Sequence, residues 1–205
     1  PVLDAIANQS IDEDNTFTYT LSATDVDENA LTYTASSSDG SISIAGSTLT
    51  LVPAEDYNGD IQVNVTVDDG ELTDNGSFIL TVLPVNDIPV LDAIANQSID
   101  EDNTFTYTLS ATDVDEDPLE YTASVNANAS ISIDGSTLSI IPYVNYNGDI
   151  AVSVTVSDGQ LIDSGSFTLT VNSVNDAPEL DAIANQSIDE DNTFTYTLSA
   201  MDIDG

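Results

Sequence analysis

The chain has 205 residues, of which 37 are Asp or Glu, and it contains no Lys, Arg or His, so its formal net charge is −37 at pH 7. This composition excludes salt bridges between side chains, and it excludes nucleic acids and anionic membranes as partners, because both are bound through basic residues. It also excludes disulfides, since Cys is absent, and no apolar run approaches the ~20 residues of a membrane-spanning helix. Because 40% of the residues are apolar and recur at the period of a strand, we expect folded domains that carry the charge on their surface.

An internal repeat organises the chain. The segment LDAIANQSIDEDNTFTYTLSA occurs unchanged at residues 3–23, 91–111 and 180–200. The copies divide the chain into residues 1–88, residues 89–177 and the start of a third repeat at 178–205. The second repeat is one residue longer, with the sequence VNANA before Ser130, which predicts a loop there. We expect the chain to be cut from a longer array of such repeats.

Apolar and polar residues alternate within each repeat, as is typical of half-buried strands. In the first repeat the expected strands cover residues 3–11, 17–21, 31–35, 42–44, 49–51, 61–67 and 78–82. Turns are predicted at Gly46, at Asp69-Gly70 and at Asn75-Gly76, and no segment has a helical period. About seven short strands in about 90 residues are typical of a Greek-key sandwich. The predicted fold class is therefore all-β, with tandem seven-stranded Greek-key β-sandwiches.

Oxygen-bearing side chains gather at three places in each repeat. The first is the segment DED at residues 12–14, and the second is DVD at residues 25–27, which returns at 113–115 and as DID at 202–204. The third is Asn-Asp in the joints, which we define as joint one (residues 84–89) and joint two (residues 173–178). Calcium takes about 6–8 oxygen ligands, mixing carboxylates with amide and backbone carbonyls, and these residue types would supply them.

The acidic segments have two simpler interpretations than a metal site built from several loops. A contiguous EF-hand loop is excluded, because a loop beginning at Asp25 would place Ala30 and Ser36 where that motif needs Gly and Glu. A solvated acidic surface, as in halophilic or marine proteins, with Asp and Asn side chains that only cap turns, is the simpler alternative. It does not explain why the acids gather at particular places, so any calcium site is expected to be assembled from several loops.

In these motifs the chain resembles the cadherin-like tandem repeats of large bacterial surface and secreted proteins. The matching pieces are the VNDIP and VNDAP joints, the ED pair in IDED, the DVD loop and the DG turn after the Val-rich strand, and they extend over the whole chain. The resemblance implies a cadherin/immunoglobulin-like sandwich with calcium at each joint. The ligands that it implies are Glu13, Asp56, Asn86, Asp87, Asp113, Asp115 and Asp158 at joint one, and Glu101, Asn175, Asp176, Asp202 and Asp204 at joint two.

The chain departs from the cadherin pattern in two ways. The acidic loop of cadherins appears here as Glu55-Asp56, and in the second repeat it becomes Val144-Asn145. The joints are also shorter, because Ile88 or Ala177 replaces the second Asn of the animal motif. The resemblance therefore implies fewer or weaker calcium ions at each joint.

We do not expect an enzyme, because the usual nucleophile–base pairs need His, Cys, Lys or Arg. The tripeptide at Asp163-Ser164-Gly165 matches that of aspartic proteases, but it lies where a hairpin turn is predicted. The expected function is a calcium-stiffened spacer or adhesin shaft at a bacterial cell surface or in a secreted protein, which displays a distal module. The expected location is extracellular, and the expected partners are calcium ions and neighbouring repeats.

Two alternative functions remain open. One is a carbohydrate-binding module of a secreted polysaccharide-degrading protein, with Tyr57, Tyr143 and Tyr146 near the Asn-Gly turns as candidate sugar-binding residues; these tyrosines otherwise pack at a sandwich corner. The other is calcium-dependent contact with another cell surface through the repeats. Residues 178–205 are too few to bury Phe194, Tyr196 and Leu198, so we expect strand exchange with a neighbouring molecule or completion by a longer array.

Overall fold

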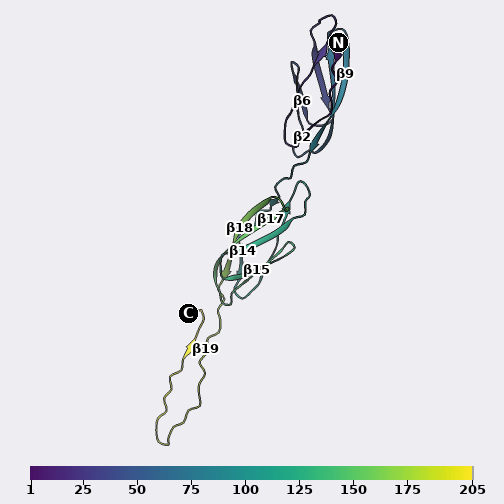
Figure 1. Ribbon diagram of the computed structural model, residues 1–205. Coiled ribbons are helices and arrows are strands. Elements are labelled where there is room, and N and C mark those ends of the chain that lie inside the picture. Colours follow the sequence, from purple (N-terminus) through teal and green to yellow (C-terminus); the bar gives the residue numbers. More distant parts are fainter. Residues whose placement is uncertain (205) are drawn as a thin grey trace. The chain divides into compact units, whose positions relative to one another are not determined.

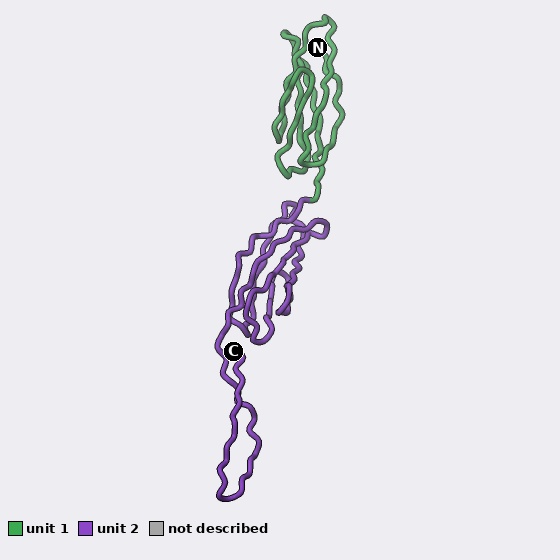
Figure 2. The backbone as a smooth tube through the Cα atoms, turned by 90° about the vertical axis from the view of Figure 1, so that its left-hand side faces the viewer, with its two compact units in different colours: residues 1–86 green, residues 87–205 purple. Residues whose placement is uncertain are grey.

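The computed structural model describes residues 1–204, which form strands and turns (Figure 1). They make up two compact units, unit 1 from Pro1 to Asn86 and unit 2 from Asp87 onward (Figure 2). The predicted all-β fold class is confirmed. Among the described residues there is no helix long and apolar enough to cross a membrane.

Unit 1 is a sandwich of two main sheets. Its strands are β1 (Val2–Leu3), β2 (Gln9–Asp12), β3 (Phe17–Thr20), β4 (Ala23–Thr24), β5 (Thr32–Ser37), β6 (Ser41–Ala45), β7 (Thr48–Val52), β8 (Gly59–Asp68) and β9 (Thr73–Leu83). One sheet has the order β2-β9-β8-β5 and the other β3-β7-β6, while β1 and β4 form a separate two-stranded pair. The two main sheets together contain the seven strands of the predicted sandwich.

Unit 2 repeats this topology and adds the start of the third repeat. Its strands are β10 (Val90–Leu91), β11 (Gln97–Asp100), β12 (Phe105–Thr108), β13 (Ala111–Thr112), β14 (Glu120–Val125), β15 (Ala129–Asp134), β16 (Thr137–Pro142), β17 (Gly148–Ser157), β18 (Ile162–Asn172), β19 (Glu179–Leu180) and β20 (Ala200–Met201). The main sheets are β11-β18-β17-β14 and β12-β16-β15, and β19 pairs with β20.

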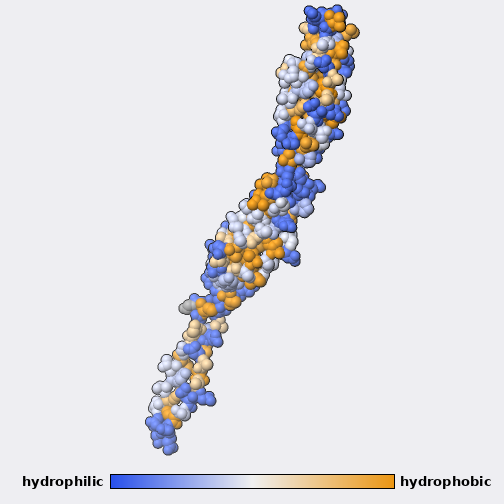
Figure 3. Space-filling model, in the orientation of Figure 1, coloured by the Kyte–Doolittle hydropathy of each residue, from blue (hydrophilic) through white to orange (hydrophobic). Residues whose placement is uncertain are grey.

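The core of each repeat lies between its two main sheets. In unit 1, Leu49 and Leu51 of β7 are fully buried together with Ile61, Val63 and Val65 of β8. Each such side chain contributes roughly 1.5–3 kcal/mol when it is fully buried. The outward-facing residues of the same strands are mainly the polar residues Thr, Asp, Gln and Asn, so the alternation in the sequence corresponds to inside and outside. In the space-filling view the strongly hydrophilic residues are prominent at the ends of the repeats (Figure 3).

The first expected strand, residues 3–11, is wrong as a single element. Leu3 of β1 pairs antiparallel with Ala23, whereas β2 pairs in parallel with β9, with Gln9 opposite Leu80. Between the two strands the chain leaves one pairing and joins another, while Ile6 packs against the core. Asn8 supports the change, because its side-chain oxygen accepts a hydrogen bond from the backbone N–H of Ile79 at 3.0 Å.

The turn expected at Asn75-Gly76 is also wrong, as is the equivalent turn at Asp163-Ser164-Gly165. Both segments lie inside long strands, β9 and β18, and the hairpins close earlier, around Gly70 and Gly159. Gly76 is required for packing, because a Cβ there would lie 2.9 Å from Cδ2 of Leu3. The glycine therefore makes room for β1 on the sheet and does not form a turn.

Residues 178–204 form an open loop joined by the short β19–β20 pair (Figure 1). Phe194 is 50% exposed, whereas the equivalent Phe17 of the first repeat is 6% exposed. Tyr196 and Leu198 are likewise exposed. This segment thus presents apolar residues that the complete repeats bury between their sheets.

Candidate metal centres at the ends of the repeats

Each complete repeat has acidic loops at both ends. The entry-end loops, at residues 25–29 and 68–72 in the first repeat, lie beside the N-terminal strand of that repeat. The exit-end loops, at residues 12–15 and 53–57, lie beside the strand that leaves it. The parallel pairing of β2 with β9 brings residues 12–15 to the exit end, because Asp12 lies opposite Leu83 at the end of β9.

A buried glutamate holds the chain where it leaves each repeat. Glu13 is buried, its N–H donates to the carbonyl oxygen of Leu83 at 2.9 Å, and its Oε1 accepts from the N–H of Val85 at 2.5 Å. Glu101 is buried in the same way and accepts from the N–H of Val174 at 2.6 Å. No basic side chain exists to neutralise either carboxylate, so backbone N–H groups provide the compensation.

A second carboxylate at the exit end was not among the predicted ligands. Oδ1 of Asp14 accepts a hydrogen bond from the N–H of Asp56 at 3.2 Å, and Oδ1 of Asp102 accepts from the N–H of Asn145 at 3.0 Å. Asp14 and Asp56 have positive φ values of 60° and 55°. The signal in the sequence was the third residue of DED, which directly follows the glutamate. The structure therefore adds Asp14 and Asp102 to the exit-end acids.

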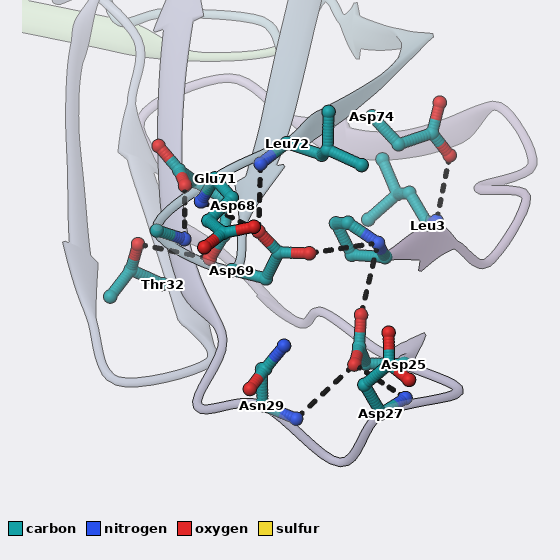
Figure 4. A network of polar contacts seen from close by, with 12 residues as sticks. Leu3, Asp25, Asp27, Asn29, Thr32, Asp68, Asp69, Glu71, Leu72 and Asp74 are labelled. Atoms are coloured by element: carbon teal, nitrogen blue, oxygen red, sulfur yellow. Dashed lines mark hydrogen bonds and ion pairs between the residues drawn. The ribbon is translucent and has the colours of Figure 1, made fainter.

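At the entry end of unit 1, two aspartates from different loops converge on one cationic group. Oδ2 of Asp25 lies 3.1 Å from the Pro1 ammonium nitrogen, and Oδ2 of Asp69 lies 3.5 Å from it (Figure 4). The other oxygen, Oδ1, of each is used within its own loop. Oδ1 of Asp25 accepts from the N–H groups of Asp27 and Asn29, while that of Asp69 accepts from Glu71 and Leu72 (Figure 4).

These contacts shift the pKa values in opposite directions for the amine and the acids. The hydrogen bond to Asp25 raises the pKa of the Pro1 amine above its usual value. The N–H of Asn29 and then the ammonium lower the pKa of Asp25, and the N–H groups of Leu72 and Glu71 lower that of Asp69. The pKa values of these two aspartates are thus lowered first of all by backbone N–H groups of their own loops.

The entry-end loops of unit 2 have the same internal hydrogen bonds. Oδ1 of Asp113 accepts from the N–H of Asp115 at 3.0 Å, and Oδ1 of Asp158 accepts from the N–H of Leu161 at 2.6 Å. Oδ2 of Asp113 corresponds to the oxygen of Asp25 that contacts the ammonium, and it is buried without a hydrogen-bond partner among residues 1–204. Oδ2 of Asp115 accepts from the N–H of Asp87 at 2.8 Å.

The residues predicted for joint one are divided between the two units. Glu13, Asp56 and Asn86 belong to unit 1, where Glu13 and Asp56 lie in the exit-end loops. The predicted ligands in unit 2 are Asp87, Asp113, Asp115 and Asp158, and all but Asp87 lie in the entry-end loops. Within unit 2, hydrogen bonds connect Asp87 to Asp115 and Asp115 to Asp113.

Joint two lies within unit 2, and its predicted residues come together. The N–H of Asp176 donates to Oδ2 of Asp204 at 2.5 Å, and the N–H of Asp204 donates to Oδ1 of Asp202 at 3.0 Å. Asn175 lies in the wall of a hollow that also includes Ile203 and Asp204. Asn145, Asp176 and Asp202 line a neighbouring hollow.

Burial and neighbouring negative charges both act on Asp176. Desolvation raises its pKa first, and the negative charges of Asp204, Asp102, Glu101 and Asp202 raise it further. Its Oδ2 is buried and has no hydrogen-bond partner in the described part of the chain. An all-oxygen set of carboxylates with an unpaired buried oxygen fits a hard divalent cation such as calcium.

The comparisons with known proteins agree with this architecture. Residues 85–172 match the family model of the cadherin-like domain, and residues 1–81 match that of the bacterial Ig domain. Chitinase A of Pseudoalteromonas piscicida is 29% identical over 154 residues, which is 73% of this chain and 19% of that protein. The chain therefore spans about a fifth of the length of this curated relative.

Two solved structures share the fold. The first two extracellular cadherin domains of human protocadherin-24 superpose with a TM-score of 0.51 and 19% identity, covering 75% of this chain and 86% of that one. The five extracellular cadherin domains of protocadherin gamma B2 give a TM-score of 0.57 and 18% identity, covering 98% of this chain and 45% of that one. At these identities the likeness concerns the fold.

Proposed function

We propose that this chain, which is a tandem array of cadherin-like repeats, is a calcium-stiffened spacer or adhesin shaft of a bacterial cell-surface or secreted protein. The repeats would be residues 1–88 and 89–177, followed by the start of a third at 178–205. They display a distal module outside the cell, and no chemical step is assigned to them. The observation that carries this proposal is the environment of Asp176, which faces four other carboxylates in a chain without basic side chains.

The proposal assigns calcium to each joint. At joint one the ligands are taken from Glu13, Asp14, Asp56, Asn86, Asp87, Asp113, Asp115 and Asp158. At joint two they are taken from Glu101, Asp102, Asn175, Asp176, Asp202 and Asp204. The bound ion supplies the positive charge that the chain lacks, while Glu13 and Glu101 also hold the departing chain through Val85 and Val174.

The affinity for calcium determines how much a bound ion stabilises the folded state. Extracellular calcium modules bind with dissociation constants on the order of 10⁻⁴–10⁻³ M. At about 10 mM calcium a single site of this kind stabilises the folded state by about 1.4–2.7 kcal/mol, provided that the unfolded chain does not bind. A bound ion also neutralises carboxylates that otherwise repel one another, and for this reason we expect the array to be stiffer in calcium.

Calcium titration of the whole chain tests the proposal. Calorimetry should detect binding in the millimolar range, and small-angle scattering should give a longer particle in calcium than in chelator. The double substitution Asp113→Ala with Asp115→Ala should remove most of the effect at joint one. The matched control is Asp134→Ala, an acid at the end of β15 outside the candidate sites. Identical scattering profiles in calcium and in chelator would refute the stiffening role.

A second candidate function is suggested by the relative. Chitinase A is named for action on a polysaccharide, and this chain matches a part of it. The chain would then belong to a secreted protein that acts on polysaccharide, and it would itself bind that polysaccharide. Binding of the whole chain to insoluble chitin or cellulose in a sedimentation assay tests this function, and calcium binding at the joints is independent of it.

A further inference from the structure

The two complete repeats differ most at one place in their exit ends. In the first repeat, residues 37–40 read SSDG and residues 53–57 read PAEDY. In the second repeat the corresponding segments are VNAN at 125–128 and PYVNY at 142–146. Three acids of the first repeat, Asp39, Glu55 and Asp56, are thus replaced by uncharged residues. The loop at residues 68–72 changes less, from DDGEL to SDGQL at residues 157–161.

The two changed loops of the second repeat are in contact. The N–H of Tyr143 donates to the carbonyl oxygen of Asn128 at 2.8 Å, and Ala129 lies opposite Pro142 where β15 pairs with β16. Asn128 has a positive φ of 65°, as does the corresponding Gly40 of the first repeat at 72°. The substitutions that are separate in the sequence therefore form one continuous surface.

This surface has an exposed apolar strip bordered by amides. Tyr143 is 60% exposed, Val144 is 81% exposed and Ile141, two residues before Tyr143, is 51% exposed. Asn126 is exposed in the changed loop at residues 125–128, and its Oδ1 accepts from the N–H of Ala151 at 3.1 Å. The side-chain NH₂ of this exposed residue remains available as a donor. We call Ile141, Tyr143, Val144 and residues 126–128 the Tyr143 surface.

Tyr143 differs in its surroundings from Tyr57 and Tyr146. The hydroxyl groups of Tyr57 and Tyr146 donate to the carbonyl oxygens of Asp60 and Asp149 at 3.2 and 3.1 Å, and both rings pack against the core. These two are corner residues. The hydroxyl of Tyr143 has no hydrogen-bond partner within residues 1–204, so its ring and hydroxyl are both presented to solvent.

We propose that the Tyr143 surface binds a neutral polysaccharide, with a pyranose ring stacked on Tyr143 and sugar hydroxyls bonded to the neighbouring amides. The inference rests on the second candidate function, polysaccharide binding, and locates its binding site. An aromatic face with polar groups at its edge suits a ligand that is apolar on its ring faces and polar around them.

The negative charge of the chain disfavours anionic ligands and a second copy of the chain as partners of this surface. Anionic polysaccharides and acidic peptides are disfavoured at this surface, because it contains no basic side chain and lies on a strongly acidic chain. A second copy of the chain would bring two molecules of charge −37 together across a small patch, and their repulsion opposes such a contact. A neutral sugar chain meets no such repulsion, and the loss of three acids at this place removes the local excess of negative charge.

The test measures the affinity of the whole chain for chitohexaose and cellohexaose by calorimetry, in millimolar calcium so that the joints are occupied. The double substitution Tyr143→Ala with Val144→Glu introduces the residues of the first repeat, which are compatible with the same fold. We expect it to weaken binding about tenfold or more, as for other exposed aromatic contact residues. Ile162→Ala, which shortens an exposed apolar residue at the start of β18, is the matched control and should leave the affinity unchanged.

The reverse substitution gives a second readout. Ala54→Tyr with Glu55→Val in the first repeat should strengthen binding by adding a site. Binding that persists unchanged in the Tyr143→Ala, Val144→Glu variant would overturn the assigned surface while supporting the second candidate function. Absence of binding of the unaltered chain to both oligosaccharides and to insoluble chitin and cellulose would overturn the surface and that function together.

Discussion

Oε1 of the buried Glu101 accepts a hydrogen bond from the backbone N–H of Val174 at 2.6 Å, 73 residues further along the chain. Glu13 and Val85 have the same relationship in the first repeat. In each case an acid near the start of a repeat holds a residue just after its last strand. The acid that is proposed to bind calcium therefore also orients the joint from which further ligands come.

Replacing this glutamate should separate its two roles. Glu101→Gln keeps an oxygen that can accept from Val174, so stability in chelator should change little, while calcium affinity falls. Glu101→Ala also removes the acceptor and should cost about 1.5–3 kcal/mol, the usual contribution of a hydrogen bond to a charged group. Urea unfolding with and without calcium measures both effects. Equal calcium affinity in Glu101→Gln would remove Glu101 from the ligand set.

Asp176→Asn should affect the stability of the chain differently in chelator and in calcium. The raised pKa of Asp176 means that its ionised form is disfavoured in the metal-free folded state. The amide removes that unfavourable charge, so the variant in chelator should be at least as stable as the unaltered chain. Stabilisation by calcium should be reduced, because a carboxylate ligand is lost. Thermal melting in chelator and in calcium measures the stability of the metal-free chain and the stabilisation by calcium. A variant that is destabilised in chelator would contradict the conclusion that the charge of Asp176 is unfavourable in the metal-free fold.

The pH dependence of the metal-free chain should differ between the two units. Asp25, Asp69 and Asp74 have lowered pKa values, chiefly because N–H groups of Asn29, Leu72 and Leu3 donate to them. Their contribution to stability is present above their ordinary pKa of 3.8 and is lost as the pH falls through the lowered values.

The pKa of Asp176 is shifted in the opposite direction, so its effect on stability changes with pH in the opposite way. With a raised pKa in the folded state, its contribution is present below 3.8 and is lost as the pH rises through the raised value. NMR titration of the carboxyl carbons in chelator measures these directions residue by residue. A lowered pKa for Asp176 in metal-free protein would contradict the clustering of acids at joint two.

Two glycines with similar backbone angles should respond differently to a methyl group. Gly46 has φ +63° and open space around it, so Gly46→Ala should cost only the roughly 1–2 kcal/mol of a left-handed residue. Gly40 has φ +72°, but a Cβ there would lie 2.4 Å from the carbonyl oxygen of Val52. Gly40→Ala should therefore cost clearly more, as measured by urea unfolding. Equal losses would show that the backbone near Val52 moves freely.

The sequence was sufficient to predict the sandwich, because alternation within β3, β7, β8 and β9 follows directly from having one buried face. It was insufficient where a residue serves tertiary packing. Gly76 resembles a turn residue locally, and only the position of Leu3 shows why a glycine is needed there. The strand expected at residues 3–11 failed for the same reason, since nothing local marks the change from one sheet to the other.

The candidate site was predicted in part. The resemblance indicated Glu101, Asp176, Asp202 and Asp204, and unit 2 places them in one electrostatic group. Asp102 was missed, because its role depends on a hydrogen bond from Asn145, 43 residues away. Tyr143 was grouped with Tyr57 and Tyr146 by sequence, and only burial and hydrogen bonding separate them. Contacts between distant segments decide these cases, and spacing along the chain does not reveal them.

The parallel pairing of β2 with β9 determines how a repeat responds to tension. A stretching force applied to the two ends of the repeat displaces the parallel strands β2 and β9 in opposite directions along their common axis. Four residue pairs, from Gln9–Leu80 to Asp12–Leu83, are then loaded together in shear, and they cannot open one at a time. The same register joins β11 to β18 in the second repeat. Each repeat is therefore built to carry mechanical load along its length, and single-molecule extension should show a high unfolding force for each one.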